Sequence, residues 1–158
     1  MSFAGARVTR SHSFAVALPA REALPLFEPE GERAWAHGWD PRYVHPRDGR
    51  AEAGMVFTTD HGGEHTIWMM TRHEPAAGLV EYVRATPGSR IATVMVQCAP
   101  VAPTRTRVTV IYVLTGLSEV GNGYIHAMDE ARFRDFIDGW GKRSRAWPDE
   151  GLLTPRCQ

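Results

Sequence analysis

The sequence predicts an α+β fold in which a curved antiparallel sheet of about six to seven strands wraps around a long C-terminal helix. Apolar and polar residues alternate through several short segments before residue 118, as they do in half-buried strands. From residue 118 the apolar period changes to about 3.6 residues, which is typical of an amphipathic helix. Because a sheet with one apolar face must bury that face, we expect the terminal helix to cover it.

Size and charge indicate a single domain over residues 1–158. The chain has 158 residues, of which 43% are hydrophobic and 23% are charged, as in ordinary globular proteins. A core of this size needs neither a disulfide nor a metal ion for its stability. The formal net charge is zero, which argues against a nucleic-acid partner bound through a strongly basic surface.

The sequence carries no recognisable targeting or membrane segment. The N-terminal stretch "MSFAGARVTRSHSF" lacks the apolar run of a signal peptide, and no later run is long enough to span a membrane. We therefore expect a cytoplasmic protein with no membrane span. The two cysteines, Cys98 and Cys157, are isolated and do not make a disulfide framework. Cys98 lies within an apolar strand pattern, which favours a packed core thiol over a nucleophile.

The first strand is predicted at residues 7–18, where apolar side chains occupy alternate positions. Two short helices are expected after it. Residues 19–27 combine good helix formers with a proline at the first position, and Pro25 interrupts them after about two turns. A second short helix is predicted from residue 28, with acidic residues at its positive N-terminal end and Gly38 as its stop signal.

Six more strands are predicted between the short helices and residue 118. They cover residues 43–44, 55–60, 65–75, 79–86, 90–101 and 105–117. Gly62 and Gly63 indicate a hairpin, and Pro87 with Gly88 indicates a tight reversal. Short strands joined by such turns form an antiparallel meander.

Residues 118–147 are predicted to form one long amphipathic helix. The residues on or near its apolar face are Ile125, Met128, Arg132, Phe133, Phe136, Ile137 and Trp140. A twisted sheet wrapped around this helix leaves a concave space between them. Such a concavity is the default position for a ligand.

Strand parity selects the side chains that face this space. The face that holds Trp68, Tyr82 and Tyr112 leaves Glu81 and Gln97 outside, which is the chemically sensible choice. Residues of the second short helix and of the long helix complete the set. The candidate ligand-binding residues are Trp35, Trp39, Trp68, Met70, Tyr82, Arg84, Val96, Tyr112, Tyr124 and Met128.

Two interpretations stay open for the polar members of this set. Buried hydroxyls of Tyr82 and Tyr112 need hydrogen-bond partners, which either a ligand or the protein itself can supply. Arg84 either faces inward, where it needs an anionic partner, or lies in solvent at the strand end. Its position beside a turn slightly favours the exposed interpretation.

The stretch "EPEGERAWAHGW" presents a similar choice. Its acidic residues are most simply a solvated helix start, since no second acid or base near them marks a catalytic carboxylate. The spacing of four places Trp35 and Trp39 near the same side of a helix, although Gly38 can break that register. Both can wedge the short helices onto the core, and one can also rim a ligand entrance. A structural role is predicted for at least one of them.

No sequence motif assigns a catalytic residue. The string from His61 to His65 matches the zinc-protease pattern H-x-x-E-H, but that pattern requires a helix, whereas Gly62 and Gly63 favour a hairpin. No metal site is predicted, although a looser group of His61, His65 and His73 stays open. The chain has no nucleophile elbow, P-loop or dinucleotide fingerprint, so no cofactor is predicted and the catalytic residues stay unknown.

Four stretches of the chain resemble the START-like, or SRPBCC, superfamily, whose helix-grip fold is that of the birch-pollen allergens. They are "LFEPEGERAWAHGWDP", "VFTTDHGGEH", "TPGSR" and "YVLTGLSEVGN". They are similar to a bacterial subgroup related to polyketide cyclases and chaperone activators, and the resemblance covers residues 8–147. It implies a cavity under the long helix, with its mouth near the short helices, that binds a hydrophobic small molecule or lipid.

Three function classes follow from the pattern and the resemblance. The first is a non-catalytic module that binds a hydrophobic, lipid-like or aromatic small molecule in the cavity. The second is an enzyme of the polyketide cyclase or dehydratase kind that uses the same cavity. The third is a module that binds a partner protein. The sequence leaves open whether the protein forms a homodimer.

Overall fold

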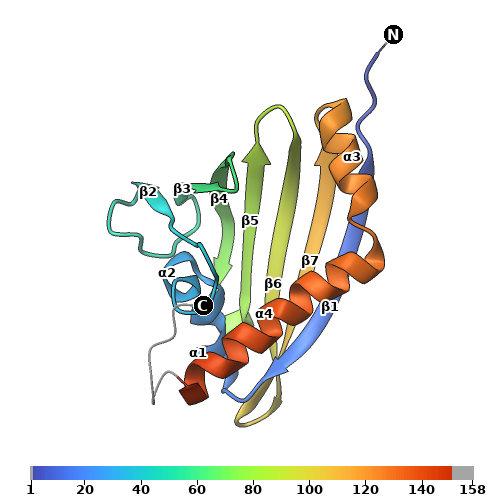
Figure 1. Cartoon of the computed structure of the whole chain (residues 1–158). Coiled ribbons are helices and arrows are strands. Elements are labelled where there is room, and N and C mark those ends of the chain that lie inside the picture. The colour runs from blue at the N-terminus through green and yellow to red at the C-terminus, as the bar shows by residue number, and fades with distance from the viewer. Residues whose placement is uncertain (1, 151–158) are drawn as a thin grey trace.

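Seven strands form one antiparallel sheet in the computed structural model, which describes residues 2–150 (Figure 1). The strand order is β1-β7-β6-β5-β4-β3-β2, so β1 and β2 lie at the two edges. The strands are β1 (Arg7–Val16), β2 (Arg42–His45), β3 (Val56–His61), β4 (Glu64–Glu74), β5 (Leu79–Thr86), β6 (Arg90–Ala102) and β7 (Arg105–Gly116). The helical segments are α1 (Ala20–Ala23), η1 (Leu24–Phe27), α2 (Pro29–Glu32), η2 (Pro75–Ala77), α3 (Glu119–Ala127) and α4 (Glu130–Glu150).

The predicted α+β class and the antiparallel meander are confirmed. Gly62 and Gly63 adopt φ angles of +58° and +80° between β3 and β4, as the predicted hairpin requires. The side chains expected to face inward are buried: Trp68, Tyr82 and Tyr112 are 7%, 4% and 6% exposed. None of the helices in the described part of the chain is long and apolar enough to cross a membrane.

The helical region after β1 differs from the two short helices predicted. Three segments form there, and the last of them, α2, ends at Glu32 instead of continuing to Gly38. Beyond it the backbone makes turns, in which the Arg33 amide bonds to the carbonyl of Glu30 and the Trp35 amide to that of Glu32. The chain must reverse here to reach the edge strand β2, and a longer helix would carry it away from the sheet.

The prediction of one uninterrupted helix over residues 118–147 is wrong. The chain forms α3 and α4, with a break at Met128 and Asp129. The side chain of Asp129 accepts a hydrogen bond from the Arg132 amide at 2.8 Å, so it caps the start of α4. The guanidinium of Arg10 on β1 donates to the carbonyl of Met128 at 3.0 Å. These two contacts stabilise a change of direction between the helices.

Helix α4 crosses the concave face of the sheet on the side of β1 (Figure 1). Its buried residues Phe133 and Ile137 join the core, and His12 of β1 pairs with Asp138 at 2.7 Å. Toward β4 and β5, a cavity separates α4 from the concave face of the sheet. The stretch from α2 to Trp39 covers part of that face, and the site described below lies between this stretch and α4.

Trp35 joins the short helices to the middle of α4. Its side chain is 4% exposed, and its indole nitrogen donates to the carbonyl of Leu26 at 2.7 Å. Its ring centroid lies 5.6 Å from that of Phe27 and 5.6 Å from that of Trp140. The structural role predicted for at least one of the two tryptophans is confirmed for Trp35.

We expect Trp35→Ala to lower the free energy of unfolding by roughly 3–5 kcal/mol, because it removes a large buried ring and leaves a cavity. Urea unfolding followed by circular dichroism measures the change. Trp35→Phe, which keeps a ring but loses the bond to Leu26, should cost clearly less. A Trp35→Ala protein as stable as the wild type would show that the ring is not part of the core.

Candidate functional site

A cavity of about 380 Å³ lies between the sheet, the stretch from Glu32 to Trp39, and α4. Aromatic rings dominate its wall. They belong to Trp35, Trp39, Trp68, Tyr82, Tyr112, Phe136 and Trp140. This size and lining match the sites in which proteins enclose small organic molecules.

The strand register explains why the cavity is open at this place. Tyr82 of β5 pairs with Val94 of β6, and Val94 pairs with Tyr112 of β7. The two tyrosine rings therefore flank a small side chain in one row across the sheet. Val96, the next inward residue of β6, is equally small. Large side chains on the flanking strands and small ones on β6 leave room above the middle of the sheet.

One end of the cavity is a cluster of packed rings. Trp68 stacks on Phe57 at a centroid distance of 5.5 Å and an interplanar angle of 9°. Trp39 meets Trp68 edge to face at 5.4 Å, and Tyr82 does so at 5.9 Å. The indole nitrogen of Trp68 donates to the Thr59 hydroxyl at 3.0 Å. These contacts hold each ring in one orientation, so this wall is preformed.

The hydroxyl groups of the two inward tyrosines differ in their surroundings. Tyr82 donates to the carbonyl of Phe27 at 2.8 Å, so the protein itself satisfies that hydroxyl. Burial raises the pKa of Tyr82 well above its usual value. Burial also raises the pKa of Tyr112 to about 12, and nearby Arg84 opposes the shift. Both tyrosines are therefore neutral at physiological pH.

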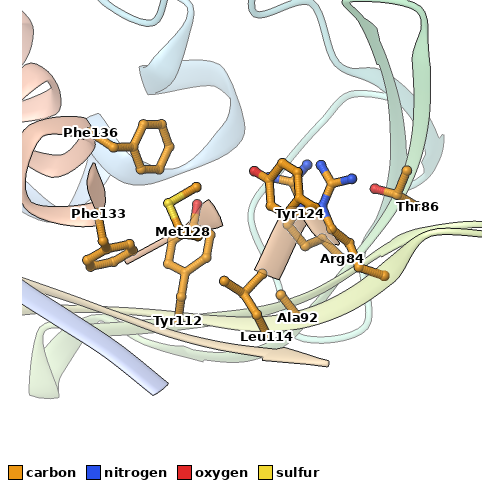
Figure 2. A pocket seen from close by; sticks show the side chains of 10 residues that line it. Arg84, Thr86, Ala92, Tyr112, Leu114, Tyr124, Met128, Phe133 and Phe136 are labelled. Atoms are coloured by element: carbon orange, nitrogen blue, oxygen red, sulfur yellow. The ribbon is translucent and has the colours of Figure 1, made fainter. Parts of the chain in front are cut away.

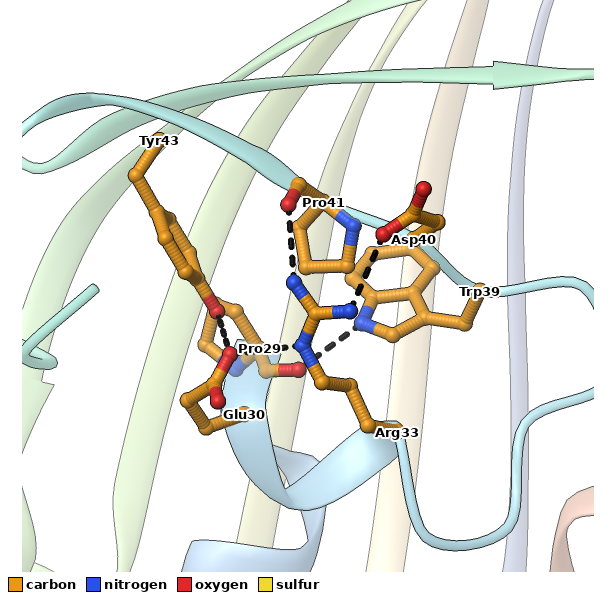
Figure 3. Close-up of polar contacts among 7 residues, drawn as sticks. All are labelled: Pro29, Glu30, Arg33, Trp39, Asp40, Pro41 and Tyr43. Carbon is orange, nitrogen blue, oxygen red and sulfur yellow. Dashed lines mark hydrogen bonds and ion pairs between the residues drawn. The ribbon is translucent and has the colours of Figure 1, made fainter. Parts of the chain in front are cut away.

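An exposed polar network anchors the stretch that covers the cavity (Figure 3). The guanidinium of Arg33 contacts Glu30 at 2.7 Å and Asp40 at 3.0 Å, and it donates to the carbonyl of Pro41 at 3.0 Å. The Tyr43 hydroxyl donates to the same Glu30 carboxylate. The network ties both ends of the stretch together on the solvent side, which leaves Trp35 and Trp39 directed at the cavity.

Glu32 is the acidic residue that the network turns inward. It lies at the end of α2 and lines the cavity. Gly31 sets this position, because a Cβ atom there would lie 1.8 Å from the carbonyl oxygen of Pro25. Burial raises the pKa of Glu32 well above its usual value of 4.5, and the charge of Arg84 only partly opposes the shift. A half-buried acid with a perturbed pKa in a cavity is typical of functional sites.

The sequence slightly favoured a solvent-exposed Arg84, and that prediction is wrong. Arg84 lines the cavity, and its guanidinium carbon lies 4.5 Å from the centroid of the Trp68 ring. Trp68 and Arg84 are directly paired across β4 and β5, so the register brings the cation over the ring. Tertiary contacts decide this position, because a strand end next to a turn can point equally well into a fold or into solvent.

A second, smaller cavity of about 30 Å³ lies under α3 and shares Arg84, Tyr112 and Phe136 with the first (Figure 2). Tyr124 of α3 and Met128 line only this one. The guanidinium carbon of Arg90 lies 3.5 Å from the centroid of the Tyr124 ring. This space is large enough for about one water molecule and extends the main cavity toward α3.

The candidate residues are thus brought together at one place, with one departure. Trp35, Trp39, Trp68, Tyr82, Arg84, Val96 and Tyr112 line the main cavity, and Tyr124 and Met128 line the smaller one. Met70 lines neither, because it is fully buried beneath the rings. Whether these residues bind a ligand stays a prediction.

Several residues that line the cavity are absent from the candidate set, among them Glu32, Phe136, Trp140 and Arg143. For Glu32 a signal was present, since it precedes Trp35 by three residues and therefore shares its side of a helical turn. Phe136, Trp140 and Arg143 follow one another at spacings of four and three along α4. That spacing places all three on one helical face.

Of the other candidate chemical groups, His61 lines the cavity, whereas Cys98 and His65 have structural surroundings. Burial raises the pKa of the Cys98 thiol to about 12, which supports the predicted core role over a nucleophile. Cys157 lies outside the described residues. His65 pairs with Asp60 at 2.8 Å across the hairpin. Among residues 2–150, no group of three or more His, Cys, Asp or Glu side chains is placed to hold a metal ion.

Comparison with known proteins finds similarity in structure only. No family model and no curated protein matches the chain. A norcoclaurine synthase from Thalictrum flavum, in complex with dopamine and hydroxybenzaldehyde, superposes with a TM-score of 0.68 at 8% identity, over 93% of this chain and 89% of that one. The Zhui aromatase/cyclase from Streptomyces sp. R1128 superposes with a TM-score of 0.65 at 13% identity, over 93% of this chain and 96% of that one.

A putative protein from Rhizobium leguminosarum gives a TM-score of 0.66 at 12% identity, over 92% of this chain and 97% of that one. The chain has the helix-grip fold. The fold named by the sequence resemblance to the START-like superfamily is therefore confirmed. The superpositions establish the helix-grip architecture, but at identities this low they assign no residue roles to this chain.

Glu32 and Glu30 are expected to affect stability with opposite dependence on pH. The raised pKa of Glu32 means that the folded state holds its proton more tightly, so the wild type loses stability as pH rises above about 4.5. Glu32→Gln should therefore stabilise the protein increasingly between pH 4 and pH 8. Thermal melting over that range measures the effect.

Glu30→Gln is the matched control two residues away. Hydrogen bonds from Tyr43 and then Arg33 lower the pKa of Glu30, so its stabilising contribution is present at neutral pH and is lost as pH falls. Glu30→Gln should destabilise the protein at pH 7 and have a smaller effect at pH 3. Identical pH profiles for the two variants would contradict the inward position of Glu32.

Proposed function

We propose that the protein is a binding or carrier module for a small hydrophobic molecule with an aromatic or acyl skeleton. The observation that carries the proposal is the cavity of about 380 Å³ with its wall of aromatic rings. Ligand sites in proteins measure roughly 300–1,000 Å³ and combine apolar walls with a few polar groups. Glu32 and Arg84 are such groups here.

The preformed ring cluster supports an aromatic ligand in particular. Trp39, Trp68 and Tyr82 are held by mutual edge-to-face contacts and by hydrogen bonds, so binding needs little reordering of the wall. The names of two structural neighbours also support an aromatic ligand. One is an aromatase/cyclase, and the other is a synthase in complex with dopamine and hydroxybenzaldehyde.

A second candidate is an enzyme that acts on a polyketide-like carbonyl compound. The observation that favours it is Glu32, an acid that lines the cavity and whose pKa burial raises well above its usual value. A protonated acid can donate a proton to the carbonyl oxygen of a bound substrate, while the walls orient the flexible chain. Arg84 can stabilise the negative charge that develops on that oxygen.

Filling the cavity should abolish binding. Ala36 lines the cavity next to Trp35, so Ala36→Phe should place a ring in the space that the ligand occupies. We expect the affinity for the uncharged fluorescent probe N-phenyl-1-naphthylamine to fall about tenfold or more, as measured by fluorescence titration. Ala77→Phe, on the exposed segment η2, is the control and should bind as the wild type does.

Native mass spectrometry of freshly purified protein complements this titration by detecting a retained compound. Failure of the wild type to bind the probe, together with no retained compound, would overturn the proposed binding function. Equal binding by Ala36→Phe and the wild type would place the ligand elsewhere.

Turnover of a substrate tests the proposed enzymatic function directly. With a poly-β-keto thioester as substrate, Glu32→Gln should lower the rate about a hundredfold or more, because amide replaces acid at similar size. Glu22→Gln, on the exposed side of α1, is the control. Chromatographic analysis of cyclised products measures the rate. Absence of turnover by the wild type, or an unchanged rate in Glu32→Gln, would leave the protein a binding module.

A further inference from the structure

The cavity wall carries an excess of positive charge. Four residues that carry formal charge at neutral pH line it: Glu32, Glu64, Arg84 and Arg143. Glu64 is already neutralised, since its two carboxylate oxygens accept bonds from Arg90 at 2.8 and 2.9 Å. The remaining three sum to one positive charge when Glu32 is ionised and to two when it is protonated. Either state favours an anion in the cavity.

Arg143 is the least satisfied of these groups. Its Nε atom is buried and lacks a hydrogen-bond partner among the described residues. Burying such a donor without a partner is unfavourable unless another molecule accepts its hydrogen bond. Gly139, one turn earlier on α4, makes room for the side chain, because a Cβ atom there would lie 3.2 Å from Nη1 of Arg143. The guanidinium therefore packs back along the helix at the cavity.

Arg84 is held in place without a carboxylate in contact. Its guanidinium lies over the face of the Trp68 ring, a contact that does not use its N–H groups as hydrogen-bond donors. Within the described part of the chain, no carboxylate lies within ion-pair distance of it. Its electrostatic neighbours are Glu32, Tyr112 and the Arg90-paired Glu64. A planar guanidinium held in this way suits an oxyanion.

We propose that the ligand is an organic monoanion, an aromatic or acyl acid, whose carboxylate is bound by Arg84 and Arg143 while its apolar skeleton lies against Trp35 and Trp39. This inference rests on the proposed binding function and names the chemical class of its ligand. Glu32, which lines the same cavity and interacts with Arg84, can donate its proton to the same anion.

Two fluorescent probes with the same aromatic frame test the charge requirement. 1-Anilinonaphthalene-8-sulfonate is an anion, and N-phenyl-1-naphthylamine lacks its sulfonate group. We expect the wild type to bind the anion at least tenfold more tightly, and each probe to displace the other. Charge-assisted hydrogen bonds of the expected strength correspond to about this factor or more.

Single variants assign the preference to the two arginines. Arg84→Gln and Arg143→Gln should each lower the affinity for the anionic probe about tenfold. Each should change the affinity for the uncharged probe less than about twofold. Arg134→Gln, on the exposed face of α4, is the matched control and should change neither. Circular dichroism and melting curves verify that each variant is folded, and the two arginines provide independent tests if one variant fails to fold.

Each outcome decides one of the two proposals. Equal affinity of the wild type for both probes, or equal weakening of both probes in the arginine variants, overturns the anionic ligand but leaves the binding function intact. Binding of neither probe overturns this inference, and together with the absence of a retained compound it also overturns the binding function. An anion preference that survives both arginine variants places the charge recognition elsewhere on the molecule.

Discussion

The site depends on the polar network around Arg33, which holds the stretch from Pro29 to Tyr43 against the sheet. This stretch has little regular structure, so backbone hydrogen bonds alone do not determine its path. Arg33 bonds to Glu30 and Asp40 on the solvent side, and Trp39 donates to the carbonyl of Pro29 at 2.8 Å. With its polar groups satisfied outside, the stretch presents its rings to the sheet and closes the cavity.

The cavity reflects two opposing requirements, a closely packed core for stability and empty space for a ligand. A core of this size gains most stability when it has no voids. Here β6 contributes small side chains between the large rings of its neighbours, and a half-buried acid, Glu32, lowers stability at neutral pH. The ring cluster around Trp68 and the contacts of Trp35 offset that loss. Stability given up at one place in a fold is a common mark of a functional site.

The binding and enzymatic functions use the same polar groups in different ways. For a carrier, Arg84 and Arg143 hold an anion and Glu32 supplies one more hydrogen bond. For an enzyme, Glu32 donates its proton and Arg84 stabilises the charge that develops. The three structural neighbours described above share 8–13% identity with this chain, so they share its architecture, while the lining of the cavity must be interpreted from this chain's own residues.

The sequence by itself determined the strands, their turns and the inward parity of Trp68, Tyr82 and Tyr112, because alternation and turn residues are local properties of the chain. The tertiary structure alone decided that Glu32 and Arg84 face the cavity, that the terminal helix breaks at Asp129, and that Arg143 packs over Gly139. These features depend on which distant segments lie opposite each residue. Burial, and with it charge state, is settled only when the short helices and α4 close over the sheet.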